Sequence, residues 1–522
     1  MSSISSITKA VSGLTTAQKG LMVTGQNLSN VNTKGFTRQQ LLQAESSYLT
    51  IGNRGGRYMQ VGLGVSQTEI RQIRDELADR RLREETSVLN YYQTQNATIE
   101  EVLGILDEPY GEGVTNLLNK FWSQTSKLSS NPDGVEERQS FISAANVLIK
   151  KINDITESIT KMQTNANSEV IKAVGRVNEI IKGISEYNEL INQKEINGDN
   201  ANDYRDQRNV LLDELSTYGK ISYYEEADSR VVLKFENHIV VDGPFVTSMK
   251  LRSIDQSVFV NPAWTDTDSD VYHFNETITA AKENDTGKLK ALLVTRGENY
   301  VTGTTTWNDI ALNDNFSVDQ TGNSFILPKI QKLLNDFTSQ LVDLVNDNLK
   351  GTGIGIHEGQ PGVPVFVPIK ASQPFLAGNI QVNPLLLEDG GYNKLGTVDA
   401  GGDDNNVGDN SCVDKLLREW SMTRGWYEGV TDASTPHAKR ASIMSFYAEF
   451  VTDIGTDGTS YSNMARSKST SVMNIENERQ AIGGVSMDEE FTYMLKYQYA
   501  YNASARMITM LDSMLDTIIN KM

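Results

Sequence analysis

Apolar residues at both ends of the chain recur at the spacing of one helix face. Near the N-terminus the steps are three, four or seven residues, at Ile4, Ile7, Val11, Leu14, Leu21 and Leu28. Near the C-terminus similar steps recur at Met494, Tyr497, Tyr501, Ile508, Leu511, Leu515, Ile518 and Met522. This pattern predicts an amphipathic helix at each end, and both sets fit the a and d positions of a coiled-coil seam. Two interpretations stay open: the helices pack on the body of one domain, or they pair with each other and with neighbouring copies.

Long apolar stripes between the ends predict a helical body. The expected helices span 71–106, 113–128 and 135–196. In the third helix the apolar stripe slips by four residues after Ala166, a stutter that locally unwinds a coiled coil. Gly175 and Gly183 each weaken a helix by up to about 1 kcal/mol relative to alanine, so a bend or break is expected there.

The pattern changes near residue 219, where short apolar runs begin to alternate with turn residues and predict strands as far as about 320. Further helices are expected at 287–294, 325–349, 413–420, 438–451, 462–477 and 488–522. The Gly/Ser/Asp-rich stretch 455–462 is expected to interrupt the helical pattern between helices 438–451 and 462–477. The acidic residues 488–490 lie in the first turn of the last helix, where negative charge meets the positive end of the helix dipole.

The expected fold is mainly α with a β-rich insert, in a nested order of three domains. The predicted domains are a terminal coil of 1–35 with 485–522, a helical body of 36–218 with 412–484, and a mainly β insert of 219–411 that contains helix 325–349. The terminal helices enclose the helical body, which encloses the insert.

Composition narrows the possible partners. The chain has 522 residues and a net charge of −19 without basic clusters, which argues against nucleic acid and anionic lipid as partners. No run of about 18 apolar residues predicts a membrane span, and the N-terminus lacks the pattern of a cleavable secretory signal. Cys412 is the single cysteine, so no intrachain disulfide is possible.

Candidate chemistry is sparse. The four histidines lie far apart without metal-ligand spacing: His238, His273, His357 and His437. The acidic stretch from Asp399 to Asn410 lacks the EF-hand spacing, which favours a solvated loop over a calcium site. No nucleophile elbow is present, although the many carboxylates leave open a pair of the kind that a glycosidase uses. We therefore predict no catalytic residue, no cofactor and no metal.

The most specific pattern follows the first apolar seam, from Thr24 to Gln39 in the sequence TGQNLSNVNTKGFTRQ. Its Asn and Gly residues tolerate left-handed backbone, so the segment predicts a helix stop and a turn. The segment resembles the signature of the axial proteins of the bacterial flagellum. The Arg38-Gln39 ending, together with the run GVSMDEE at 484–490, resembles the flagellar hook-associated protein 1 family of hook–filament junction proteins. The motif residues are Asn27, Asn30, Asn32, Thr33, Gly35, Arg38 and Gln39.

The resemblance implies a structural protein that acts by self-assembly and not by catalysis. In that family the terminal helices pair as an inner coil of the axial tube. The implied partners are further copies in a ring, the hook protein, a second junction protein or the filament, and an export chaperone. It implies an extracellular location in the flagellum, reached without cleavage through the flagellar type III export channel. The residues expected to pack in the assembly are Ile4, Ile7, Val11, Leu14, Leu21, Leu28, Met494, Tyr501, Ile508, Leu511, Leu515 and Ile518.

Two alternatives follow from the same residues. A flagellar hook or distal-rod protein would share the segment 27–30, but the long stuttered helix and the Arg38-Gln39 ending argue against it. A secreted surface hydrolase or adhesin could use flagellar-type ends for export alone. In the junction-protein interpretation the ends are expected to be poorly ordered in the free chain, because one exposed seam cannot repay its ordering entropy.

Overall fold

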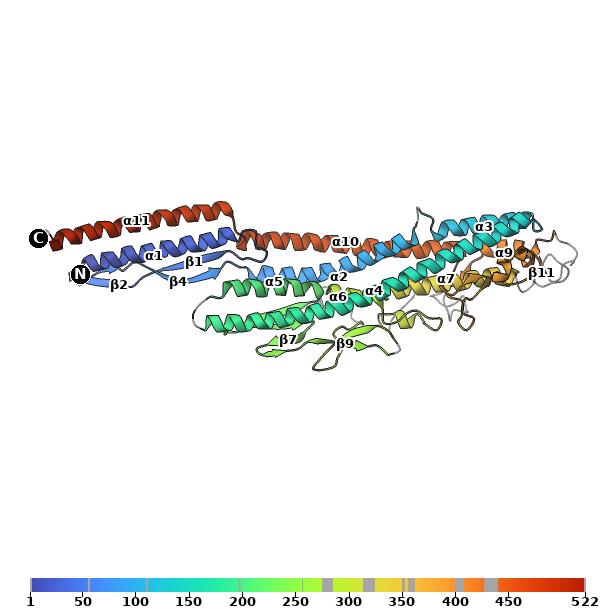
Figure 1. Cartoon of the computed structure of the whole chain (residues 1–522), viewed down its shortest axis with the longest axis horizontal. Helices are drawn as coiled ribbons and strands as arrows, with labels where there is room; N and C mark the ends of the chain where they lie inside the picture. Colours follow the sequence, from blue (N-terminus) through green and yellow to red (C-terminus); the bar gives the residue numbers. More distant parts are fainter. Residues whose placement is uncertain are drawn as a thin grey trace. The chain divides into compact units, whose positions relative to one another are not determined.

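The computed structural model forms two compact units (Figure 1). It describes residues 2–54, 57–108, 111–196, 198, 200–255, 257–274, 285–312, 324–349, 353–354, 362–399, 408–426 and 440–520. The terminal unit comprises residues 1–87, 177–248 and 468–522. The central unit comprises residues 88–176 and 249–467. Three helices belong partly to each unit: α2 (Glu76–Leu106), α4 (Val135–Glu195) and α10 (Ile443–Gly483).

The terminal unit contains the helices of both chain ends and two small groups of strands. Its further helices are α1 (Ser2–Ser29), α5 (Asn202–Tyr218) and α11 (Met487–Asn520). Its strands are β1 (Gln39–Glu45), β2 (Tyr48–Arg54), β3 (Arg57–Gly62), β4 (Val65–Gln72), β5 (Ile221–Glu225), β6 (Val231–Phe235), β7 (His238–Asp242) and β8 (Phe245–Val246). β1 pairs antiparallel with β4 from Gln39↔Gln72 to Glu45↔Val65, and β2 pairs with β3. β5 to β8 form an antiparallel meander in sequence order.

The central unit is built around a large hydrophobic core. Its further helices are α3 (Val114–Ser130), α6 (Gly287–Arg296), η1 (Asn308–Ile310), α7 (Ile326–Leu349), α8 (Pro384–Leu387), η3 (Gly391–Lys394) and α9 (Ser411–Trp420). Its short strands pair two by two: β9 (Met249–Ser253) with β10 (Val260–Trp264), β11 (Gly353–Ile354) with β14 (Val398–Asp399), β12 (Phe366–Val367) with β13 (Gln381–Val382), and β15 (Arg424–Gly425) with β16 (Arg440–Ala441). Phe121, Phe141 and Phe337 are fully buried in a core shared by α2, α3, α4, α7, α9 and α10.

Several predicted helices are confirmed. The expectations for 113–128, 135–196, 287–294, 325–349 and 413–420 correspond to α3, α4, α6, α7 and α9. α4 runs unbroken through both glycines, so the expected break does not occur. Its apolar stripe stays buried on both sides of Gly175, and that burial outweighs the roughly 1 kcal/mol that each glycine costs. A Cβ at Gly183 would lie 2.9 Å from Leu211 Cδ1, so this glycine leaves space for α5.

Two boundaries differ from the prediction. The stretch 455–462 does not interrupt a helix, because α10 is continuous from Ile443 to Gly483. Gly458 lies where a Cβ would be 2.7 Å from Ile99 Cγ2, so this glycine permits close helix packing instead of forming a turn. α2 begins at Glu76 and not at 71, because Arg71 is still in β4 and Asp75 caps the helix by accepting hydrogen bonds from the amides of residues 77 and 78.

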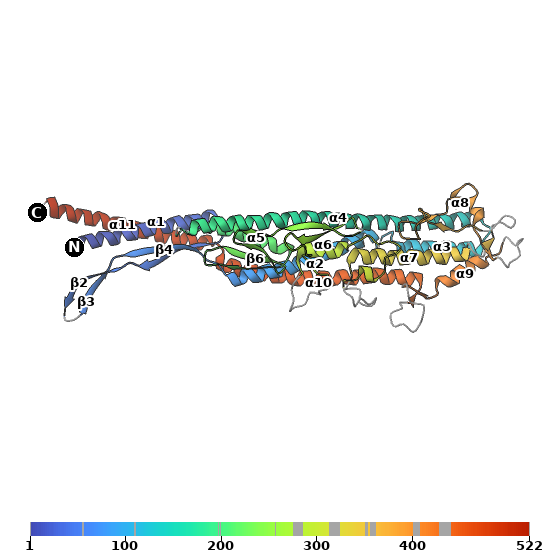
Figure 2. The ribbon, with the colours of Figure 1, turned by 90° about the horizontal axis from the view of Figure 1, so that it is seen from below.

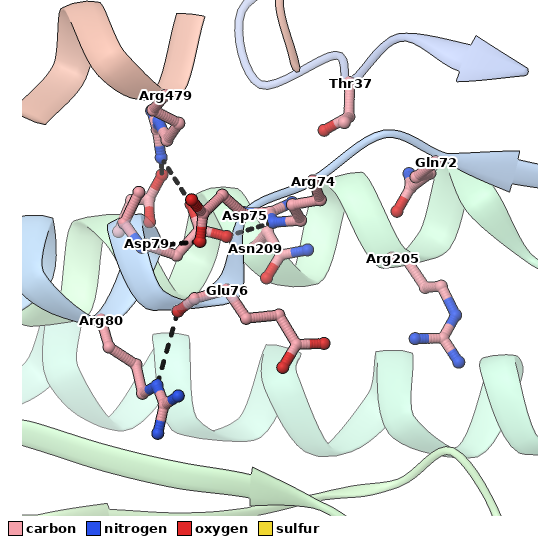
Figure 3. A network of polar contacts seen from close by, with 12 residues as sticks. Thr37, Gln72, Arg74, Asp75, Glu76, Asp79, Arg80, Arg205, Asn209 and Arg479 are labelled. Atoms are coloured by element: carbon pink, nitrogen blue, oxygen red, sulfur yellow. Dashed lines mark hydrogen bonds and ion pairs between the residues drawn. The ribbon is translucent and has the colours of Figure 1, made fainter. Parts of the chain in front are cut away.

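A partly buried ionic cluster ties three helices of the terminal unit together (Figure 3). Arg83 of α2 donates to Asp213 of α5 at 2.7 Å, and Arg479 of α10 donates to the other oxygen of Asp213 at 2.8 Å. Asp79 of α2 pairs with Arg74 and with Arg479. Burial favours a higher pKa for Asp213, but the nearby Arg83 and Arg479 outweigh it and hold this pKa below its ordinary value. The charged form of Asp213 therefore depends on these two arginines.

Asp206 of α5 fixes the segment that follows α1. Its carboxylate accepts a hydrogen bond from the Thr37 amide at 3.2 Å and one from Gln72 Nε2 at 2.8 Å (Figure 3 shows Thr37 and Gln72). The side chain is 4% exposed. Burial raises the pKa of Asp206 to about 6, although the hydrogen bonds of Thr37 and the charge of Arg74 favour the ionised form.

The raised pKa predicts that acid strengthens this part of the fold. Asp206 binds a proton more tightly when folded than when unfolded, so its contribution to stability grows as pH falls through about 6. Between pH 7.5 and 5.5 the gain is about 1 kcal/mol. Urea unfolding, followed by hydrogen exchange of α5 peptides, should show this gain in the parent chain and its loss in Asp206→Asn. An identical pH dependence in the two proteins would contradict the assignment.

Candidate assembly interface

α1 and α11 pack as an antiparallel pair through contacts that repeat every seven residues. Figures 1 and 2 both show the two helices side by side. The facing pairs are Asn27 with Glu490, Gly20 with Tyr497, and Gly13 with Ser504. A Cβ at Gly20 would lie 2.5 Å from the Tyr497 ring, and one at Gly13 would lie 3.0 Å from Ser504 Oγ. The α1 face toward α11 therefore depends on small residues, which let the two helices approach closely.

The predicted packing residues of α11 largely face α1, whereas those of α1 lie beside its α11-facing side. In α11, Met494, Ile508, Leu511 and Leu515 are half-buried and share the three- and four-residue spacing of the row that contains Glu490 and Ser504. Tyr501 of the same set is 36% exposed. This set is therefore largely on the α1 side of α11.

In α1 the predicted set lies beside the face that packs on α11. The buried residues of that helix are Ala10, Thr16, Ala17, Gly20, Val23, Thr24 and Asn27. Val11 is 43% exposed, and Ile7, Leu14, Leu21 and Leu28 are half-buried. The side chains of Ile4 and Ile518, and all of Met522, lie outside the described part of the chain. The α1 set thus keeps apolar surface that α11 of the same chain does not cover.

The motif residues Asn27, Arg38 and Gln39 meet Glu490 in a polar clasp. Asn27 Nδ2 donates to the Gln39 carbonyl at 2.9 Å and to Glu490 Oε2 at 3.0 Å, and Asn27 Oδ1 accepts from the Gln39 amide at 3.0 Å. Arg38 Nε donates to Glu490 Oε1 at 2.8 Å. Asn27 is 1% exposed and Glu490 is 2% exposed. We call these four residues the clasp, because they join the end of α1, the start of β1 and the start of α11.

The other motif residues form the turn after α1. Asn30 Nδ2 donates to the Gln26 carbonyl at 3.0 Å, and Thr33 Oγ1 donates to Asn30 Oδ1 at 3.1 Å. Gly35 has φ +82°, and a Cβ there would lie 2.1 Å from Val210 Cγ2 of α5. Asn32 is exposed. A side chain at position 35 would therefore clash with α5 as well as strain the backbone.

The buried role of Glu490 and the backbone contacts beside it could not be predicted from the sequence, in which Glu490 stands only in the first turn of an expected helix. The Arg38 amide donates to the Gly483 carbonyl at 2.9 Å, and the Ile73 amide donates to the Arg38 carbonyl at 2.8 Å. The only available signal was the presence of Asn27, Arg38 and Glu490 in two quoted motifs, which gives no pairing.

The other candidate chemistry has little structural support. Among the described residues no group of three or more His, Cys, Asp or Glu side chains is arranged to hold a metal ion. Residues 400–407 and the side chain of Asp399, which make up most of the acidic stretch, lie outside the described residues, as do His357 and His437. Cys412 is buried. No helix within the described ranges is long and apolar enough to cross a membrane.

The clasp predicts a sharp difference between two neighbouring glutamates. In Glu490→Gln, Arg38 loses a buried charge partner, and the new amide group cannot accept from both Asn27 and Arg38. The terminal unit should lose roughly 2 kcal/mol of stability. Hydrogen exchange of the peptides around residues 20–28 and 488–497 should accelerate accordingly.

Glu489→Gln is the matched control. Glu489 also pairs with Arg38, at 2.9 Å, but its side chain is 59% exposed. An exposed ion pair contributes at most about 1 kcal/mol, so exchange should change little. Equal effects of the two substitutions would show that burial of Glu490 is not what holds α11.

Two family models match the middle of the chain and its C-terminal end. The family model described as flagellar hook-associated protein FlgK helical domain matches residues 99–366. The model described as flagellar basal body rod FlgEFG protein C-terminal matches residues 482–521, which include Glu490 and all of α11.

Similar proteins extend over almost the whole chain. Flagellar hook-associated protein 1 of Bacillus subtilis (strain 168) is 24% identical over 523 residues, covering 98% of this chain and 96% of the relative. Flagellar hook-associated protein 1 of Salmonella typhimurium is 22% identical over 577 residues, covering 98% of this chain and 99% of the relative. The solved structure of the flagellar hook junction protein FlgK from Burkholderia pseudomallei has a TM-score of 0.57 at 9% identity, covers 77% of this chain and 100% of its own, and shows a shared fold. Because the helical-domain model matches more than half of the residues, the chain belongs to the flagellar hook-associated protein FlgK family.

Proposed function

We propose that the chain is a structural component of the bacterial flagellum that joins the hook to the filament by self-assembly. Family membership supports this function over a hook protein, a distal-rod protein, or a surface hydrolase or adhesin with flagellar-type ends. The observation that carries the proposal is the clasped pair of terminal helices, which holds apolar rows at the surface of the terminal unit. Assembly buries surface and requires no catalytic group, so we expect no turnover.

The proposed interface consists of the apolar rows of α1 and α11, paired as a coil and continued by neighbouring copies. In α1 its members are Ile4, Ile7, Val11, Leu14, Leu21 and Leu28, and in α11 they are Met494, Tyr501, Ile508, Leu511, Leu515 and Ile518. The partial exposure of the described members, such as Val11 and Tyr501, supports further burial against other copies. Apolar burial at about 25 cal/mol per Å² favours association once several copies meet.

The proposed partners follow from a junction role. They are further copies in a ring, the hook protein, a second junction protein or the filament, and an export chaperone that would cover the apolar ends before assembly. Export through the flagellar type III channel would deliver the chain to the extracellular flagellum. The motif residues would act by fixing α11 beside α1 and not by contacting a partner directly.

The terminal helices depend on neighbours more than the central unit does. Glu490 is buried, whereas none of the described side chains after it in α11 is buried. The core of the central unit, by contrast, contains many residues below 2% exposure, such as Phe121 and Leu341. We infer that the ends are held mainly by the clasp and become fully ordered on assembly.

A double substitution in α11 tests the interface. Leu511→Asp with Leu515→Asp places two charges in the α1-facing row and should block assembly, leaving the central unit folded. Incorporation into flagella and swimming motility measure the first effect, and near-ultraviolet circular dichroism measures the second. Asp512→Ala with Asp516→Ala, at exposed positions of the same turns, is the matched control. Motile filaments built by the Leu511/Leu515 variant would show that this row is not the assembly element.

Hydrogen exchange of the purified monomer tests the order of the ends. The expected result is much faster exchange in residues 1 to about 35 and 485–522 than in a protected centre, with the remaining protection of the two ends concentrated beside the clasp. Equally strong protection at the ends would mean that α1 and α11 already satisfy each other within one chain. The proposed coupling of folding to assembly would then be wrong.

A further inference from the structure

α11 carries a second apolar row that neither the sequence analysis nor the contact with α1 accounts for. Its first members are Phe491, Leu495 and Tyr499, at steps of four residues. These side chains are 50%, 52% and 73% exposed. Farther along the helix Met510, which is 58% exposed, lies on nearly the same side as Tyr499. At 3.6 residues per turn this row lies on the side of α11 away from the row that faces α1. We call Phe491, Leu495 and Tyr499 the outer row.

α1 borders a groove on its side away from α11. Four of its residues line the groove: Lys19, Met22, Val23 and Gln26. The other walls are β1, β4 and the connection from α4 to α5, with Leu41, Ile70 and Tyr204 among the lining residues. The groove has a volume of about 710 Å³. Val23 and Leu41 are each 7% exposed, whereas Met22 at its edge is 68% exposed. Figure 1 shows α1 between α11 and the strands that form this groove.

We propose that this groove receives the outer row of α11 from a second copy of the chain. The inference rests on the proposed function and assigns a specific contact within the assembly. A volume of this size can accept large side chains, and aromatic side chains are frequent anchors at protein contacts. Polar residues such as Gln26, Gln67 and Asn200 line the groove beside its apolar residues and suit the hydroxyl group of Tyr499. The buried Val23 and Leu41 supply an apolar floor, and Met22 supplies an adaptable edge.

The positions of the two surfaces determine the kind of assembly. The outer row and the groove lie on different helices, on sides that face away from each other within the terminal unit. One copy can therefore offer its outer row to one neighbour and its groove to another. Such a heterologous contact generates a closed ring or an open helical array, and not a closed pair.

The charges of the two helices favour this pairing over contact between two α11 helices. α1 contains Lys9 and Lys19 and no acidic residue. α11 contains Asp488, Glu489, Glu490, Asp512 and Asp516 against Lys496 and Arg506. Glu489 and Glu490 are already paired with Arg38 of the same chain, so the remaining net charge of α11 is small and negative. Contact between two α11 helices is therefore weakly repulsive, whereas contact between α11 and the positively charged α1 is attractive. Inside the groove Lys19 and Lys194 offset Glu69 and Asp203, so the attraction comes from the helices as wholes.

Cross-linking in assembled flagella tests the contact directly. The native Cys412 is buried, so introduced surface thiols are the reactive ones. A chain with Met22→Cys and Leu495→Cys, treated with a short bis-maleimide, should give a ladder of linked copies. Either substitution alone should give no ladder. Met473→Cys with Leu495→Cys is the matched control, since Met473 is a 57% exposed helix methionine of the terminal unit outside the groove.

Each outcome has one meaning. A ladder from the double variant alone supports the heterologous contact. Linked pairs from Leu495→Cys alone would overturn it in favour of α11 against α11. Incorporated but unlinked chains would overturn the inference and leave the proposed function intact, whereas absence of the parent chain from flagella would overturn the proposed function itself. If Leu495→Cys does not incorporate, Tyr499→Cys occupies the next turn of the same row.

A charge in the outer row gives an independent measurement. Leu495→Asp should lower incorporation into flagella at least tenfold. Leu190→Asp, at a 37% exposed leucine of α4 in the same unit, should not. Normal incorporation of the Leu495→Asp variant, alongside failure of the Leu511/Leu515 variant, would show that only the α1-facing row of α11 is used.

Discussion

The burial of the Glu490 carboxylate is the constraint on which the terminal unit depends. A carboxylate that is 2% exposed is stable only when other groups replace its water, and here Asn27 and Arg38 do so at 3.0 and 2.8 Å. Asn27 belongs to α1 and Arg38 to the segment before β1. The Glu490 carboxylate therefore fixes the position of both segments relative to α11. Asn27 also closes a two-way bond with the backbone of Gln39. The polar motif thus sets the register that the apolar rows then follow.

From this fixed point the helix pair follows by geometry. Steps of seven residues away from Asn27 and Glu490 lead to Gly20 with Tyr497 and to Gly13 with Ser504. Small residues on α1 bring the helices close, and that closeness moves the larger α1 side chains to the flank. The clasp sets a register in which small residues of α1 face α11. The larger apolar side chains of α1 have no space on that face and are therefore partly exposed. Apolar surface that one chain cannot cover is what an assembling subunit needs and what a monomer would avoid.

Periodicity predicted most of the fold because the long helices carry continuous apolar stripes. α4 was predicted through its stutter, and α7 through a stripe that is almost wholly buried. Glycines were harder, since Gly458 and Gly183 serve close packing and not turns, and a single sequence gives no sign of which neighbour approaches. The motif residues of the candidate site were identified, but their pairing with Glu490 was not, because it joins positions more than 450 residues apart. The small-residue face of α1 was not predicted for a related reason: a pattern of large apolar residues does not include Gly13, Ala17 and Gly20.

The two units show different ways of reaching stability. In the central unit a large buried cation finds its partners within the chain: Arg138 is fully buried and donates to the carbonyls of Pro132 and Leu395 and to the Thr397 hydroxyl. In the terminal unit the polar anchors are also complete, at Glu490, Asp206 and Asp213, but the apolar surface is not. Polar contacts specify one geometry at little net gain in stability, whereas apolar burial supplies most of the free energy. A unit that has complete polar contacts but too little apolar burial adopts the right geometry with low stability. Further copies of the chain would supply the missing burial without altering the geometry that the clasp has set.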